Sequence, residues 1–193
     1  MRLFVAFTPP PEALAELEAA VAPLRQSWPG LRWAGQDKWH VTLAFLGEVE
    51  AARRDELEIR LERAAGRHPP RVVRIGVGGA FPSPGRARVL WAQITGEQSA
   101  LDGLSALAAS VAAGARRAGA PPPDEDRGYR PHLTLARVRR PADLRVLIGE
   151  LSGFHGSEWT ASGIELIQSL QGSEQRYETL ARWSLGAGRA RRG

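Results

Sequence analysis

Two short segments of the sequence carry a histidine and a threonine two positions apart. They are His40-Val-Thr-Leu43 and His132-Leu-Thr-Leu135. Side chains two apart on a β-strand share one face. Each segment therefore predicts a strand that presents its His and Thr to one side and its apolar residues to a core. Two such strands indicate a shared cleft with approximate twofold symmetry.

Two histidines in one cleft are suited to acid–base catalysis near neutral pH, because an unperturbed imidazole titrates at about 6.5. One ring takes a proton from water and the other gives one to a leaving oxygen, and each transfer contributes about 10²–10⁴-fold in rate. A neighbouring threonine hydroxyl adds a donor for a phosphate oxygen. A lone strand histidine is more often structural, but the duplication favours catalytic roles for His40 and His132. His68 and His155 lack the pattern and are predicted to be surface residues.

Composition limits the other kinds of chemistry. The sequence has no cysteine, and no carboxylate adjoins either motif. Two isolated histidines are fewer ligands than a zinc site uses. We therefore expect no metal and no cofactor. The absence of cysteine fits a cytoplasmic protein.

Charge and hydropathy favour a soluble protein with a polyanionic partner. The 193 residues carry a formal net charge of +5, and Lys38 is the only lysine among 26 basic residues. A GC-rich genome accounts for most of this bias, although arginine also suits phosphate because its planar fork binds oxyanions in pairs. No apolar run is long enough to cross a membrane, and the apolar start is too short for a signal peptide.

Hydrophobic periodicity outlines the elements that position the motifs. It predicts strands at residues 3–7, 40–46, 72–77, 89–94, 132–138, 164–170 and 177–185, and helices at 14–24, 51–65, 101–111 and 141–151. The Gly- and Pro-rich segment 78–87 is predicted to link two lobes, because the order strand, helix, His-x-Thr strand, helix then starts again. A hairpin turn is expected at 172–175. Residues 1–185 would form one two-lobed domain, and 186–193 a basic flexible tail.

Longer stretches around the motifs carry a family resemblance. They are Phe4-Val-Ala-Phe7, Trp39 to Gly47 and Tyr129 to Arg137, with a weaker match at 167–180. Together they resemble the 2H phosphoesterase superfamily, and within it the bacterial and archaeal RNA 2′,3′-cyclic phosphodiesterases, historically called 2′-5′ RNA ligases. The resemblance implies an α+β fold. Its two pseudo-symmetric lobes of antiparallel sheet would carry outer helices and enclose a central cleft, with no metal requirement.

The same resemblance implies a substrate and residue roles. The substrate would be an RNA 3′ end that carries a 2′,3′-cyclic phosphate. His132 would be the general base and His40 the general acid that protonates the departing O3′, leaving a 2′-phosphate. Thr42 and Thr134 would bracket the phosphate, and Arg137 matches a family arginine five residues after the histidine. Strict alternation places Arg137 opposite His132, so a bulge or a strand end would be needed.

Aromatic residues beside the motifs are candidates for stacking on a nucleobase. Phe45 and Trp39 flank the first motif, and Tyr129 precedes the second. Core packing is the alternative for each, and alternation favours it for Phe45. Arg130 would either contact phosphate or lie in solvent.

Other functions remain open. The same histidine pair could act on small cyclic nucleotides, 2′-5′ oligoadenylates or a cyclic ADP-ribose phosphate. A non-catalytic RNA-binding module would instead bind without either histidine. ATP-driven ligation is disfavoured, since no Lys-x-Asp-Gly motif or Gly-rich phosphate loop occurs, whereas ATP-independent 2′-5′ joining is possible as the reverse reaction. We expect a monomer that acts on RNA ends or cyclic nucleotides and does not bind membranes.

Overall fold

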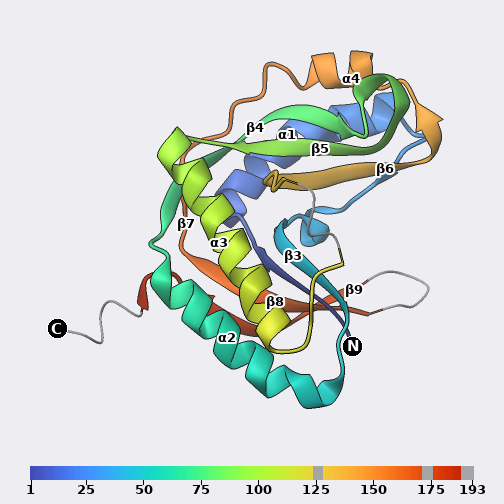
Figure 1. The fold of residues 1–193 in the computed structure, drawn as a ribbon. Helices are drawn as coiled ribbons and strands as arrows, with labels where there is room; N and C mark the ends of the chain where they lie inside the picture. The colour runs from blue at the N-terminus through green and yellow to red at the C-terminus, as the bar shows by residue number, and fades with distance from the viewer. Residues whose placement is uncertain (124–127, 171–175, 188–193) are drawn as a thin grey trace.

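The structure is a computed structural model that describes residues 1–123, 128–170 and 176–187. Within these residues the strands are β1 (Arg2–Phe7), β2 (Arg32–Trp33), β3 (Val41–Glu48), β4 (Arg71–Phe81), β5 (Ala87–Thr95), β6 (His132–Ala142), β7 (Trp159–Ala161), β8 (Gly163–Leu170) and β9 (Arg176–Ser184). The α-helices are α1 (Pro11–Ser27), α2 (Arg54–Arg67), α3 (Gln98–Arg117) and α4 (Arg145–Glu150). The predicted α+β class is confirmed (Figure 1).

The strands form one antiparallel sheet that divides into two matched halves. The strand order is β7-β4-β5-β6-β3-β1-β8-β9, and β2 pairs with β6 at Ala136 and Arg137, beyond the point where β3 meets it. We call β3-β1-β8-β9 the first half and β7-β4-β5-β6 the second half. Both motif strands therefore lie at the centre of the sheet. Val41 pairs with Leu133 where β3 meets β6, which places His40 and His132 on neighbouring strands.

The segment 78–87 does not link the two halves, so this prediction is wrong. Residues 78–81 continue β4, and β4 pairs with β5 as far as Phe81 and Val89. The segment therefore contains the turn of a hairpin inside the second half. The first half is completed by β8, whose Ile167 pairs with Phe4 of β1. Strand pairing is non-local, so the order of elements along the chain does not reveal which strands share a half.

Smaller differences concern the ends of elements. Pro141 lies within β6, and α4 begins at Arg145 rather than at the proline. The short strands β2 and β7 were not predicted. His40 immediately precedes β3. The expected hairpin turn at 172–175 and most of the expected basic tail lie outside the described residues.

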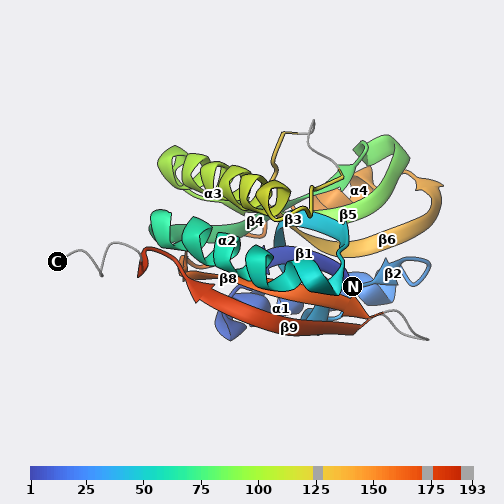
Figure 2. The same cartoon turned by 60° about the horizontal axis from the view of Figure 1, so that its bottom comes forward.

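The helices connect the two halves. Helices α2 and α3 pack against each other, as both views show (Figures 1 and 2). Helix α3 contacts both β3 and β4, and α1, which follows β1 of the first half, contacts β4 of the second. Leu104, Leu107 and Val111 of α3 are fully buried at helical spacing. Among the described residues, no helix is long and apolar enough to cross a membrane.

Candidate active site

The motif strand of the first half presents its side chains to two different environments. Val41 and Leu43 are buried in the core, whereas His40 and Thr42 are half-buried on the other side of the sheet. We call this second side the open face. Thr42 pairs with Ala6 of β1, and antiparallel partners point to the same side. The open face therefore continues from the motif strand onto β1.

A β-bulge interrupts the alternation of β3 just after this motif. Ala6 pairs with Thr42, whereas its neighbour Val5 pairs with Ala44. Leu43 is consequently an extra residue, the arrangement that defines a bulge. Leu43 and Ala44 are both buried, at 6% and 8% exposure. The next side chain therefore returns to the open face one position later than alternation predicts.

The bulge brings Phe45 onto the open face. Phe45 pairs with Phe4, which lies two residues from Ala6 and shares its face. The Phe45 side chain is 56% exposed, and its ring centroid lies 6.1 Å from that of Phe4. The preference for core packing drawn from strict alternation is therefore wrong for this residue.

The motif strand of the second half has the same bulge at the equivalent place. Trp91 pairs with Thr134, whereas Leu90 pairs with Ala136. Leu135 is the extra residue here, and it is buried together with Ala136. The sequence Leu-Ala thus forms the bulge in both motifs.

The second bulge returns Arg137 to the face of His132. Arg137 is exposed and pairs with Val89, which shares the face of Trp91. Its positive charge lowers the pKa of His132 and opposes the burial that raises the pKa of Tyr177. Its guanidinium is therefore near one histidine and near an aromatic residue of the other half. The bulge required for a phosphate-binding Arg137 is present.

Aromatic rings enclose both histidines. Each imidazole has one neighbour from the adjacent strand and a second from a strand further out, and one ring in each set stands edge-on to the imidazole. The ring centroid of His40 lies 4.7 Å from that of Phe4 and 5.2 Å from that of Tyr177. The ring centroid of His132 lies 5.1 Å from that of Phe81 and 6.0 Å from that of Trp91. These ring contacts could not be predicted from either motif, because the pairing of distant strands creates them.

Burial in these rings keeps the histidines neutral. It lowers the pKa of His40 to about 4, and the charge of His132 acts in the same direction while a hydrogen bond to the Lys38 backbone opposes it. Burial likewise lowers the pKa of His132, with the charge of Arg137 adding to the effect. That the two histidines influence each other electrostatically supports their sharing one site.

The hydrogen bond of His132 defines which nitrogen faces the cleft. Its Nδ1 lies 2.7 Å from the backbone carbonyl oxygen of Arg130. A carbonyl only accepts, so Nδ1 carries the proton in the neutral ring and Nε2 has a free lone pair. His132 is thus prepared to accept a proton at Nε2. Arg130 therefore fixes the His132 tautomer through its backbone carbonyl, whereas its side chain is exposed.

Two of the aromatic candidates pack largely against the core. Trp39 is 1% exposed and belongs to the core. Tyr129 also packs against the core, and burial raises the pKa of its hydroxyl, which has no hydrogen-bond partner among the described residues. Trp39 is nevertheless among the residues that line the pocket beside His40, and Tyr129 is only partly buried, so stacking on a nucleobase stays a prediction for both. Each lies on a segment just before its motif strand, where the chain turns inward.

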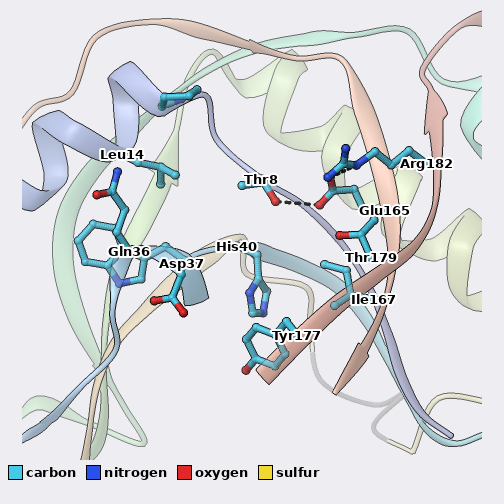
Figure 3. A pocket seen from close by; sticks show the side chains of 12 residues that line it. Thr8, Leu14, Gln36, Asp37, His40, Glu165, Ile167, Tyr177, Thr179 and Arg182 are labelled. Atoms are coloured by element: carbon cyan, nitrogen blue, oxygen red, sulfur yellow. Dashed lines mark hydrogen bonds and ion pairs between the residues drawn. The ribbon is translucent and has the colours of Figure 1, made fainter. Parts of the chain in front are cut away.

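A pocket of about 500 Å³ opens beside His40 on the first half (Figure 3). Tyr177 and Ile167 form part of its wall, and Glu165 contributes a carboxylate. This volume is within the range of pockets that hold small ligands. His40 lines this pocket, so the pocket adjoins the histidine pair and belongs to the same candidate site.

The other histidines and possible metal ligands lie elsewhere. His68 Nε2 is 2.7 Å from the Ser110 hydroxyl between α2 and α3, and His155 is exposed. Among the described residues, no group of three metal-ligating side chains occurs. His68 is thus partly buried and bonded, which differs from the surface position expected for it.

Paired histidines, two hydroxyls and an arginine on one open sheet face constitute a site suited to cleaving phosphate esters by acid–base catalysis. Comparison with known families agrees with this class. The chain belongs to the LigT-like phosphoesterase family, which it matches over residues 7–91 and 95–175. The two matched segments contain one histidine motif each, and the resemblance noted in the sequence is confirmed.

Individual relatives cover most or nearly all of the chain. A Thermus thermophilus protein named RNA 2′,3′-cyclic phosphodiesterase is 31% identical over 96% of this chain and 90% of its own length. A protein of the same name from Archaeoglobus fulgidus is 32% identical over 72% of this chain and 74% of its own length.

Solved structures share the fold. The crystal structure of TT0787 from Thermus thermophilus has a TM-score of 0.74 at 30% identity, covering 96% of this chain and 98% of that one. The structure of LigT from E. coli in complex with 3′-AMP has a TM-score of 0.67 at 26% identity, covering 95% of this chain and 96% of that one.

Proposed function

We propose that this protein hydrolyses the terminal 2′,3′-cyclic phosphate of RNA to a 2′-phosphate without a metal ion. The observation that carries the proposal is the pair of half-buried histidines, one from each half of the sheet, on one open face with Thr42, Thr134 and Arg137. The names of the relatives, and the 3′-AMP complex of E. coli LigT, support a ribonucleotide substrate.

In the proposed reaction, the neutral Nε2 of His132 removes a proton from water as the water oxygen attacks phosphorus. The bond between phosphorus and O3′ breaks, and His40 in its protonated form gives its proton to O3′. The products are a 3′-hydroxyl and a 2′-phosphate monoester, and one proton has moved from the acid to the base. Thr42, Thr134 and Arg137 donate hydrogen bonds to the non-bridging oxygens as negative charge develops.

The residues at the two bulges suggest how the substrate is oriented. Phe45 and Arg137 occupy equivalent places, five residues after His40 and His132 respectively. An exposed aromatic ring suits a nucleobase, and a guanidinium suits phosphate. The bases would therefore lie over the first half, next to the histidine that protonates the leaving oxygen.

The Phe45→Ala variant tests this orientation. Stacking of one base contributes about 1–3 kcal/mol, so we expect KM for a short RNA to rise by about tenfold while kcat changes little. Phe45→Trp should retain the wild-type KM. Val146→Ala is a control, because Val146 is an exposed apolar residue on α4. An unchanged KM for Phe45→Ala would remove Phe45 from the binding site.

The pH dependence should differ between free and bound enzyme. Burial lowers the pKa of both histidines, so the free enzyme at neutral pH lacks the proton that the general acid requires. We expect kcat/KM to be greatest below pH 6.5 and to fall as the pH rises, since it reports the free enzyme. A bound phosphate anion raises both pKa values, so the optimum for kcat should lie at higher pH. Coincident profiles measured from pH 4.5 to 8.5 would contradict this account.

The proposed activity is tested by incubating the protein and EDTA with a short RNA that ends in a 2′,3′-cyclic phosphate. We expect turnover and a product with a 2′-phosphate, identified by ³¹P NMR or mass spectrometry after selective digestion. A 3′-phosphate product would agree with the enzyme class but would show that O2′, rather than O3′, is the leaving oxygen. Hydrolysis of small cyclic nucleotides alone would exclude RNA as the preferred substrate. Binding of RNA without any turnover would favour a binding module.

A further inference from the structure

A partly buried carboxylate lies close to the proposed phosphate site. The side chain of Glu165 in β8 is 16% exposed and lines the pocket beside His40. Thr8 Oγ1 donates a hydrogen bond of 2.9 Å to one carboxylate oxygen, and Arg182 Nε one of 2.7 Å to the other (Figure 3). Arg182 offsets the charge of the carboxylate, and the carboxylate oxygens can only accept hydrogen bonds, so this part of the pocket suits a neutral ligand group that donates them.

Strand register gives the distance between this carboxylate and the phosphate site. Thr42, Ala6 and Glu165 are paired across β3, β1 and β8 and share the open face. Two strand spacings separate Thr42 from Glu165, which is about 10 Å. A ribose with an attached base spans such a distance. With the cyclic phosphate at Thr42, the edge of the base therefore reaches Glu165.

The second half has no equivalent space. Thr134, Trp91 and Gly79 occupy the corresponding row across β6, β5 and β4. The Trp91 ring covers Gly79 so closely that an added Cβ there would lie 2.3 Å from it. In the first half the small side chain of Ala6 leaves this volume open. The asymmetry restricts base binding to the side of His40.

We propose that this pocket binds the base of the terminal nucleotide and that Glu165 reads its hydrogen-bond donors, with guanine preferred. The inference rests on the proposed function and names the base recognised at the same site. The apolar side chains of Leu14, Ile167 and Tyr177 line the pocket and contact the base. Guanine presents two adjacent donors, N1–H and the 2-amino group, which match the two oxygens of a carboxylate. Adenine and cytosine present an amino group alone, and uracil a single N–H.

Thr8 and Arg182 hold the carboxylate in place for this role. Each bonds a different oxygen of Glu165, and each oxygen keeps a lone pair for the ligand. Preorganisation of this kind increases discrimination, because a base with fewer donors leaves lone pairs of the partly buried carboxylate unsatisfied. Thr8 and Arg182 are therefore positioning residues.

The test compares four short RNAs that differ only in the base bearing the 2′,3′-cyclic phosphate. We expect kcat/KM for guanosine to exceed that for uridine by about tenfold or more, the usual worth of a bidentate contact. Glu165→Gln should lower the guanosine value most and so remove the preference. Glu158→Gln is the matched control, because Glu158 also pairs with an arginine, Arg74, but lies at an exposed site. It should leave all four rates at wild-type values.

Calorimetric binding of 3′-GMP and 3′-UMP decides the inference independently of turnover. We expect tighter binding of 3′-GMP, and equal affinities in Glu165→Gln. Equal values for all four bases in the wild type, or an equal loss for all four in Glu165→Gln, would overturn base reading while the proposed activity stands. Absence of turnover with a preserved 3′-GMP preference would instead overturn the activity and keep the pocket.

Discussion

His40→Asn and His132→Asn should each lower kcat by about 10²–10⁴-fold, the range that one proton transfer contributes. Asparagine retains a polar side chain but cannot take up or release a proton near neutral pH. The histidines are held among aromatic rings that remain in both variants. We therefore expect the folded structure to persist. The measurement is the rate of hydrolysis of a cyclic-phosphate RNA at saturating substrate, with thermal unfolding followed in parallel.

A control variant distinguishes the loss of a catalytic histidine from the loss of a histidine elsewhere in the protein. His155 is exposed, and His155→Asn should have the wild-type rate. The double variant at His40 and His132 should be little slower than either single variant, because an acid and a base that act in one step are not additive. A single variant that keeps more than a tenth of the wild-type kcat would exclude its histidine from proton transfer.

Arg137→Gln should lower kcat/KM by about 10²–10³-fold, comparable with the loss of one donor that stabilises a developing oxyanion. The bulge places Arg137 on the open face, where its charge influences both His132 and Tyr177. Arg137→Lys should recover part of the loss, since it keeps the charge but not the paired donors. Steady-state kinetics with a short RNA substrate give both values.

The same variant has a second consequence that distinguishes its position from a general charge effect. Arg137 lowers the pKa of His132, so its removal should shift the acid side of the kcat/KM profile to higher pH. Arg63→Gln removes a positive charge from the exposed surface of α2 and should change neither the rate nor the profile. If kcat/KM of Arg137→Gln were within a few-fold of the wild-type value, phosphate binding would rest on the threonines alone.

The motifs were predictable because they depend on local rules. Alternation along a strand put His40 and Thr42 on one face and Val41 in the core, and the structure agrees. The same rule failed at the next residues, where Leu43 and Ala44 are both buried in a bulge. Bulges depend on pairing with a partner strand, which no single segment encodes. The Leu-Ala pair that precedes both Phe45 and Arg137 is the only sign of the bulges in the sequence.

Predictions that required knowledge of the neighbouring strands were less successful. Trp39 adjoins a motif histidine yet is almost fully buried, which its position in the sequence does not indicate. Glu165 has no motif around it and becomes noticeable only because β8 pairs with β1. The division into halves failed for the same reason, because β4 and β8 pair with strands that the element order does not indicate.

The pairing of β1 with β8 also constrains how the protein assembles during synthesis. Phe4, which supports the ring of His40, pairs with Ile167. The core strands of the second half, β4, β5 and β6, are neighbours in sequence and can associate while translation continues. The sheet beside His40 must wait until residues 163–184 have left the ribosome. A nascent chain can pair β1 with β3 early, but Tyr177 and the wall of the pocket beside His40 are added only with the last strands.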